Sequence, residues 1–386
     1  MDLTFSESQE LLRKAAHEFL DEECPASFVR DLEETSEGYS LELWHKMADL
    51  GWLGLGYPEE YGGAERDVVD LAILFEEMGY ALLPSPYSST VVQSGLPLLI
   101  AGTNQQKERF LPGIVNGDTL FSLAVLEPTT SYNPEDITAS AIADGQDYVI
   151  KGTKLFVHNA HLANWILCVT RTQESSQDCK GISLFLVESG SKGLECTLTR
   201  DIAGRQMYEV QFDSVRVPKE NLVGELHQGW ESLAKALDIA TTLQSAEIAG
   251  ICKKVLEISV DWAKQRVQFD KPIGFFQAVQ HKCVNMQVKI EETKVLVYTA
   301  AARLSQGLPS RMAVAQAKAF AGDTAQYVAY EGHQVFAGTG FMQDHDMQLY
   351  SRRLKAAEFD MGDADFHRKT ITEELASSSQ QLTLLQ

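Results

Sequence analysis

The chain of 386 residues has few cysteines, and their placement excludes the sites that cysteine usually builds. Its six cysteines are scattered and form no C-x-x-C pair. Closely paired cysteines mark structural zinc sites, and a dense cysteine framework marks small secreted domains. We therefore expect reduced thiols, with neither a disulfide framework nor a metal site.

Long apolar runs and an excess of basic residues are also missing. No stretch approaches the roughly 18 consecutive apolar residues of a membrane-spanning helix, and the residues from Met1 onward lack the basic-then-apolar pattern of a signal peptide. The 54 acidic residues outnumber the 33 basic ones and give a formal net charge of −21, which opposes binding to nucleic acid and to anionic lipid. These absences predict a cytoplasmic protein that binds neither nucleic acid nor membrane.

What the chain does have is 44 % hydrophobic residues, enough for a sizeable core. Its first third has helical periodicity. Ser6 and Gln9 form a capping box ahead of apolar residues at helical spacing, and further helices are predicted over 67–80, 90–102 and 105–116.

The residue pattern changes twice after the N-terminal third. From about residue 119 the chain has short β-rich runs separated by turn residues, and after Gly229 long helical periodicity returns. The predicted strands include 148–150, 165–169 and 182–187, and the predicted long helices lie near 230–266, 276–306, 309–338 and 345–370. Because helices and strands are segregated, the fold class is α+β and not a doubly wound sheet. The predicted domains are a helical domain over 1–118, a β domain over 119–228 and a helical domain over 229–386.

Two segments at helix boundaries carry side chains suited to a dinucleotide. In the first, Arg266, Phe269 and Gln277 offer a forked guanidinium for a diphosphate, a ring that can stack, and an amide that can bind a base edge. The second begins at Gln334 and contains Gly338, where a small residue lets backbone amides approach a phosphate.

These segments resemble the two signatures of the acyl-CoA dehydrogenase family, R-x-x-F-x-x-x-x-x-x-x-Q and Q-x-x-G-G-x-G-[FY], although Ala337 replaces the first glycine of the second. The resemblance extends over essentially the whole chain. It implies an N-terminal helical domain, a middle β-barrel or sandwich domain, and a C-terminal four-helix bundle that mediates oligomerisation. It also implies FAD bound at a subunit interface.

The resemblance further implies which residues bind FAD. The backbone of Val125 and Leu126 would face the pyrimidine edge of the flavin, and Phe156 would lie beside the ring. His158 falls where many members carry a threonine or serine bonded to flavin N5. The complete set expected to bind FAD is Val125, Leu126, Phe156, His158, Arg266, Phe269, Gln277, Gln334 and Gly338.

The catalytic base is where the sequence departs from the family. The reaction needs a carboxylate to remove the acyl α-proton while a hydride leaves the β-carbon. Aligning the C-terminal motif places Met361 at the usual glutamate, where its backbone N–H would bind the thioester carbonyl of the substrate. Aligning the alternative helix site places Ala240 at the second possible glutamate and Thr241 at its companion arginine.

Four explanations stay open. Asp363 is the base if the alignment is shifted, with Asp360 as the weaker alternative, and Glu247 is a second candidate because it lies two helical turns beyond Ala240. In the third explanation, the chain is a base-lacking subunit paired with a sister chain. Its C-terminal segment Gly362–Arg368 resembles the G-D-A-D-x-H-R segment of the sterol-side-chain-like subgroup. The fourth explanation is a different chemistry, such as dehydrogenation at a vinylogous position.

The predicted function is FAD-dependent α,β-dehydrogenation of an acyl-CoA thioester, with electrons passed to an electron-transferring flavoprotein. The sequence leaves open a homo-oligomer or a hetero-oligomer with a sister acyl-CoA dehydrogenase chain. A carrier-protein thioester, an atypical cyclic or branched acyl group, and an oxidase that uses O₂ also remain open.

Overall fold

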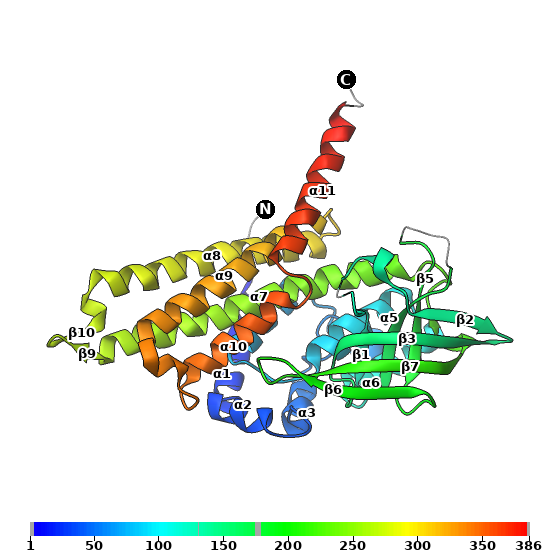
Figure 1. Ribbon diagram of the computed structural model, residues 1–386, viewed down its shortest axis with the longest axis horizontal. Coiled ribbons are helices and arrows are strands. Elements are labelled where there is room, and N and C mark those ends of the chain that lie inside the picture. The colour runs from blue at the N-terminus through cyan, green and yellow to red at the C-terminus, as the bar shows by residue number, and fades with distance from the viewer. Residues whose placement is uncertain (1–3, 130, 174–178, 384–386) are drawn as a thin grey trace. The chain divides into compact units, whose positions relative to one another are not determined.

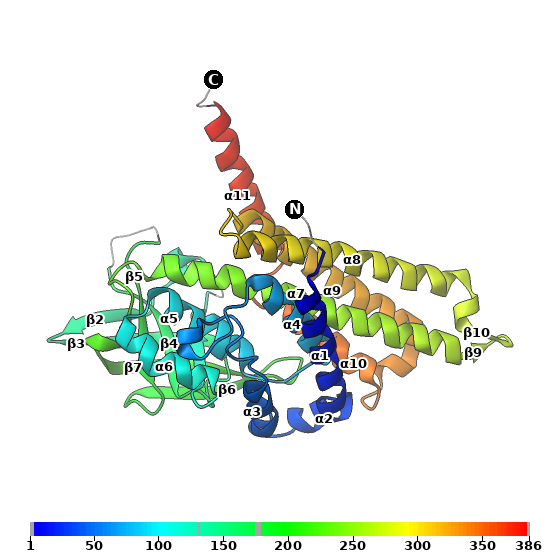
Figure 2. The ribbon, with the colours of Figure 1, turned by 180° about the vertical axis from the view of Figure 1, so that it is seen from behind.

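The computed structural model describes residues 4–129, 131–173 and 179–383. The chain forms two compact units, each assembled from separate stretches of sequence (Figures 1 and 2). The sheet unit comprises Leu32–Arg66 and Pro84–Ala240, and the helical unit comprises Met1–Asp31, Asp67–Leu83 and Thr241–Gln386. The N-terminal segment therefore contributes helices to both units.

Local capping signals start several helices of the N-terminal segment. The Gln9 N–H donates to Ser6 Oγ at 3.3 Å and the Ser6 N–H donates to Gln9 Oε1 at 3.0 Å, so the predicted capping box is present. Asp67 caps a later helix through the Val69 N–H at 2.8 Å. The helices are α1 (Glu7–Glu23), α2 (Ala26–Glu33), α3 (Leu41–Asp49), α4 (Val68–Tyr80), the π-helical η2 (Ser88–Ser94), α5 (Gly95–Ala101) and α6 (Asn104–Val115).

A mixed sheet forms the middle of the chain. Its strands are β1 (Phe121–Ala124), β2 (Ser140–Asp144), β3 (Asp147–His158), β4 (Trp165–Arg171), β5 (Ile182–Glu188), β6 (Leu194–Arg200), β7 (Gln206–Pro218) and β8 (Leu222–Val223). Their order is β6-β7-β3-β2-β4-β5-β8, and β1 pairs in parallel with β4. The turn between β2 and β3 contains Gly145 at φ +68°, as the Asp-Gly pair of the sequence predicts.

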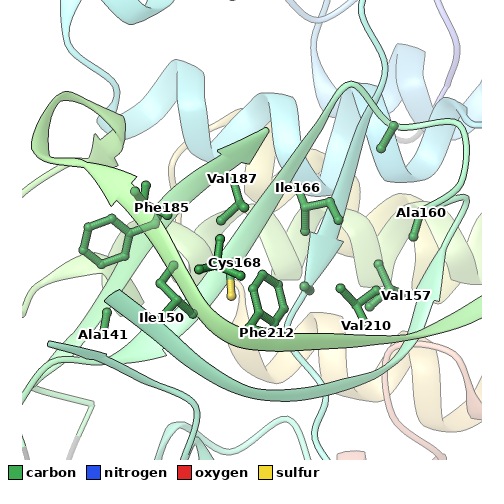
Figure 3. Close-up of a cluster of buried hydrophobic side chains, with 14 of the residues drawn as sticks. Ala141, Ile150, Val157, Ala160, Ile166, Cys168, Phe185, Val187, Val210 and Phe212 are labelled. Atoms are coloured by element: carbon green, nitrogen blue, oxygen red, sulfur yellow. The ribbon is translucent and has the colours of Figure 1, made fainter. Parts of the chain in front are cut away.

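A cluster of buried apolar side chains forms a core of the sheet unit. Figure 3 shows Ile150, Cys168, Phe185, Val210 and Phe212, from β3, β4, β5 and β7, pointing toward one another. Each is at most 2 % exposed. Burying an apolar side chain of this size contributes about 1.5–3 kcal/mol, so this cluster holds β3 and its neighbours in place.

The C-terminal segment is helical. It contains α7 (Gly229–Gln265), α8 (Gln277–Ser305), α9 (Arg311–Phe336), α10 (Asp346–Phe359) and α11 (Ala364–Thr383), with the short strands β9 (Val267–Gln268) and β10 (Lys271–Pro272) between α7 and α8. Helix α9 packs against α8, α10 and α11, and both ribbon views show α8 and α9 side by side. Among the described residues, every helix is too short or too polar to cross a membrane.

One predicted helix is split in two. The periodicity predicts a single helical stretch near 345–370, but α10 ends at Phe359 and α11 begins at Ala364. Met361 and Gly362 have φ values of +60° and +90°, which a right-handed helix cannot contain. The break creates a short loop at the position where the sequence places the catalytic motif.

Two glycines let α4 and α7 touch within the helical unit. A Cβ added to Gly79 would lie 2.1 Å from the carbonyl oxygen of Glu247, and one added to Gly250 would lie 1.8 Å from the carbonyl oxygen of Glu76. Real side-chain atoms do not approach that closely, so only glycine permits this crossing. The crossing fixes the turn of α7 that carries Glu247 against α4.

Candidate functional site

In the sheet unit, the segment that follows β1 lies against the middle of β3. The Leu155 N–H donates to the Leu126 carbonyl at 2.9 Å, so Val125 and Leu126 run beside the stretch that contains Phe156. The pairing of β3 with β7 is irregular in this stretch, and Phe156 has a φ of +54°. A bulky residue rarely adopts that conformation, and such strain concentrates at functional sites. The Phe156 side chain remains 37 % exposed.

A buried ion pair holds these two segments together. Lys154 Nζ donates to Glu127 Oε1 at 2.8 Å and to the Val125 carbonyl at 3.1 Å. Glu127 also accepts the Ala139 N–H at 3.0 Å and both the N–H and the hydroxyl of Thr138, at 2.9 and 2.5 Å. Burial acts to raise the pKa of Glu127, but the Lys154 ammonium and these hydrogen bonds lower it overall. Glu127 is therefore a charged, fully bonded carboxylate.

His158 is the last residue of β3, close to the segment that follows β1. Its carbonyl accepts the Ser122 hydroxyl at 2.8 Å, and its side chain is half-buried. The side chain of Val157 lies in the core, whereas Phe156 is exposed and His158 is half-buried. The four FAD-binding residues expected in the sheet unit thus share one short region.

In the helical unit, the expected phosphate-binding segment is a tight hairpin. Strands β9 and β10 pair through Lys271 and Gln268, and the two turn residues, Phe269 and Asp270, have φ values of +55° and +61°. Such a turn usually takes asparagine and glycine, so a phenylalanine there is strained. The Phe269 side chain is 85 % exposed. The hairpin therefore holds a bulky ring in a strained and exposed conformation.

Arg266 and Gln277 flank the hairpin. Both are exposed, and Gln277 is the first residue of α8. A groove of about 470 Å³ opens beside them, lined by Ala263, Phe275, Cys283 and other residues of α7, the hairpin and α8. An open apolar groove next to a forked guanidinium suits the base and the phosphates of a nucleotide.

The second signature lies where α9 ends. Gln334 is exposed on its last turn, and Ala337 follows the helix with φ +53° and ψ −143°. This backbone conformation strongly favours glycine, so the alanine is strained by about 1–3 kcal/mol. A Cβ added to Gly338 would meet nothing within 4 Å, which leaves its backbone open to a ligand.

The loop between α10 and α11 is held by two buried side chains. Lys318 Nζ donates to the carbonyls of Ala357, Glu358 and Gly362 at 3.3, 2.9 and 2.9 Å. Burial lowers the pKa of Lys318 to about 8, although nearby carboxylates oppose this change. The cation binds the carbonyl end of α10 and its dipole, and it anchors the loop at Gly362.

His367 binds the preceding carbonyl of the same loop. Its Nε2 lies 2.8 Å from the Met361 carbonyl oxygen. Burial, with the Lys318 charge, lowers the pKa of His367 to about 4. The ring is therefore neutral at pH 7, and Nε2 must carry the proton because a carbonyl only accepts. The peptide planes on both sides of Gly362 are thus oriented by side chains.

The two candidate bases differ in their surroundings. Asp363 Oδ1 accepts the Phe366 N–H at 2.8 Å, so its carboxylate caps the N-terminus of α11. Glu247 is half-buried on α7, opposite Gly79 of α4. The structure gives Asp363 a structural role that the sequence did not indicate, while Glu247 remains a candidate.

Lys318 and the pair of Lys154 with Glu127 were not singled out by sequence reasoning, and His367 stood out only within the segment that resembles the family ending. A signal existed for Lys318, which lies among the closely spaced alanines of α9 at a position where helical spacing predicts a buried residue. The pairing of Lys154 with Glu127 has no local signal, because the two residues are far apart in sequence.

Three family models match successive parts of the chain. The N-terminal domain model of acyl-CoA dehydrogenase matches residues 6–118, the middle domain model matches 122–215, and the C-terminal domain model matches 227–376. Among the described residues, no cluster of three or more histidine, cysteine or acidic side chains could hold a metal ion.

Whole-chain comparisons agree with these matches. The chain is 30 % identical over 380 residues to a 3-(aryl)acrylate reductase of Clostridium sporogenes, covering 96 % of this chain and 99 % of the relative. It is similar to the structure of butyryl-CoA dehydrogenase from Megasphaera elsdenii, with 29 % identity, coverage of 97 % and 100 %, and a TM-score of 0.90. It is also similar to a chain of the ChsE4-ChsE5 complex from Mycobacterium tuberculosis, with 25 % identity, coverage of 97 % and 99 %, and a TM-score of 0.89.

Proposed function

The chain belongs to the acyl-CoA dehydrogenase family, and from this premise we propose that it is an FAD-dependent dehydrogenase of an acyl-CoA thioester that passes electrons to an electron-transferring flavoprotein. The observation that carries the proposal is the hairpin at Phe269. Phe269 is exposed on a strained turn, Arg266 and Gln277 are exposed on either side of the hairpin, and an apolar groove lies in the same part of the helical unit. Six free cysteines fit a reducing compartment, and we place the protein in the cytoplasm.

The residues present fit FAD. Arg266 would bind the pyrophosphate, Phe269 would stack, and Gln277 would bind a polar edge of the cofactor. Gln334 and Gly338 form a second exposed segment with space for a phosphate. When bound, FAD supplies the acceptor for the hydride that leaves the acyl β-carbon.

The loop of Met361 supplies the thioester contact in this proposal. Its backbone N–H would donate to the thioester carbonyl, which acidifies the α-carbon without using a side chain. The bonds from Lys318 and His367 to the loop carbonyls support the proposal because they hold the loop in one conformation. A base then removes the α-proton, and Glu247 is the better placed candidate because the Asp363 carboxylate caps a helix.

The proposal is tested by the flavin content of two variants. We expect the purified protein to be yellow, and Arg266→Ala and Gln334→Ala to lose most of their FAD while keeping their helical circular dichroism, because both side chains are exposed. The matched control is Arg303→Ala, an arginine of α8 outside both signatures, which should keep its FAD. Full flavin stoichiometry in both signature variants would contradict the assignment.

A second candidate function is that of a base-lacking partner subunit. The alignment of Met361 with the usual glutamate and the capping role of Asp363 favour it, as does the resemblance of Gly362–Arg368 to the sterol-side-chain-like subgroup. The similar chain of known structure that comes from a complex of two chains, ChsE4-ChsE5, fits the same arrangement. In that case this chain completes a cofactor site and its sister supplies the base.

Co-expression separates the two functions. The chain is assayed with an artificial electron acceptor, first alone and then together with candidate sister chains that carry a glutamate at either family position. As an enzyme in its own right, the chain alone should turn over an acyl-CoA. Activity that appears only with a sister chain would make it a partner subunit.

A further inference from the structure

The pair formed by Lys154 and Glu127 is almost completely buried. The Lys154 side chain is 0 % exposed and that of Glu127 is 3 % exposed. Taking two charges out of water costs several kcal/mol each, and replacing such a pair by apolar residues is often neutral or stabilising. Stability alone therefore does not account for an ammonium at this position of β3.

The ammonium has a second acceptor with a functional consequence. Lys154 Nζ bonds the Val125 carbonyl at 3.1 Å, and that carbonyl shares one peptide group with the Leu126 N–H. A cation at the oxygen polarises the peptide and makes its N–H a stronger donor, and this effect is larger in a buried site of low dielectric. The Leu126 carbonyl is held separately by the Leu155 N–H at 2.9 Å, so the next peptide is oriented as well.

We propose that Lys154, through the Val125–Leu126 peptide, raises the reduction potential of the bound flavin. The inference rests on the proposed function, in which this backbone segment faces the pyrimidine edge of FAD. Reduction adds negative charge to that edge. A donor strengthened by a cation binds the reduced flavin more tightly than the oxidised one, and charge placed behind a direct contact is a known means of tuning a cofactor.

Glu127 has a distinct part in this arrangement. Its two oxygens accept from Lys154, Thr138 and the Ala139 N–H, so the carboxylate is fully bonded within the sheet unit. It pairs with the buried ammonium of Lys154 and fixes its direction toward Val125. Lys154 and Glu127 are therefore positioning residues, which act on the flavin through a peptide group.

The test is the midpoint potential of the flavin in purified holoprotein. The double variant Lys154→Met/Glu127→Gln removes both charges and leaves none unpaired, and its potential should be lower than that of the unmodified protein. A tenfold loss in the preference for reduced over oxidised FAD corresponds to about 30 mV for a two-electron couple. The matched control is Arg216→Gln, which removes an exposed arginine paired with Asp144 and Asp147 in the same sheet and should leave the potential unchanged.

Each outcome supports or overturns a specific claim. An unmodified protein that binds no FAD contradicts the proposed function itself. A double variant that retains FAD at an unchanged potential overturns the role of Lys154 and leaves the proposed function standing. If the methionine variant does not fold, Lys154→Gln/Glu127→Gln keeps a neutral donor and should show a smaller drop. Failure of both double variants to fold, beside a soluble Arg216→Gln protein, would make the pair a folding element and overturn the inference.

Discussion

Replacing Met361 by glutamate is expected to create or raise α,β-dehydrogenase activity by about 10²-fold or more, the usual contribution of a positioned base. On the proposed alignment, the new carboxylate stands where the family carries its base, against the acyl α-carbon. Met361 is 7 % exposed, so burial would raise the pKa of a carboxyl there and favour proton abstraction near neutral pH. Turnover of acyl-CoA with an artificial acceptor measures the effect.

The matched control for this substitution is Met361→Gln. Glutamine has the shape of glutamate without its charge, so it should add no activity. The unmodified chain should still bind an acyl-CoA and perturb the flavin spectrum, because the expected bond to the thioester comes from the backbone. If no acyl-CoA shifts that spectrum, the thioester role of the loop fails. If Asp363→Asn abolishes an activity that the unmodified chain already shows, and Met361→Glu adds none, then Asp363 is the base.

The second large effect is expected at Lys318. The substitution Lys318→Met should lower the free energy of unfolding by about 2–4 kcal/mol at pH 7. It leaves three buried carbonyls without their donor, and each unpaired group costs about 1–3 kcal/mol. Part of this loss is offset because the variant no longer buries an ammonium. Urea unfolding measures the difference. Lys14→Met is the control, since that exposed lysine should change stability by no more than about 0.5 kcal/mol.

The destabilisation caused by Lys318→Met should depend on pH. The pKa of Lys318 is lowered from 10.5 to about 8 in the folded protein. Between these values the unfolded chain binds more protons than the folded chain, so the stability of the unmodified protein rises with pH in this window relative to the variant. The free energy of unfolding of the unmodified protein rises by about 3 kcal/mol over the whole window. A pKa difference of one between the folded and unfolded states corresponds to about 1.4 kcal/mol. A difference between the two proteins that stays constant from pH 8 to 10.5 would contradict the lowered pKa of Lys318 in the folded protein.

Local signals in the sequence were enough to place most helices and strands. The capping box of Ser6 and Gln9 starts α1 where the sequence predicts it, and the Asp-Gly pair turns β2 into β3. These features involve residues within a few positions of one another, so neither depends on the rest of the chain. The segregation of helices and strands likewise determined the fold class.

The candidate site was predicted only where it consists of short motifs. Arg266, Phe269 and Gln277 were recognised because they lie close together in sequence, and the structure adds that their side chains are exposed. The helical periodicity of 345–370 predicted one helix. Periodicity carries no information on backbone dihedral angles, so it did not indicate the positive φ values of Met361 and Gly362. Asp363 was a candidate base by position alone, and its capping bond to Phe366 became visible only in the folded loop.

The sequence by itself determined the family, the fold class and the motifs expected to bind FAD. Each of them depends on residue types that recur at short spacings along the chain. Only the tertiary structure decided which charges are buried and what they bind. Lys318 reaches the loop of Met361 from α9, and Lys154 reaches Glu127 and Val125 from β3. A lysine in water and a lysine in the core look the same in a sequence. The energy of its charge is set by the desolvation and the acceptors that only the packed chain brings to it.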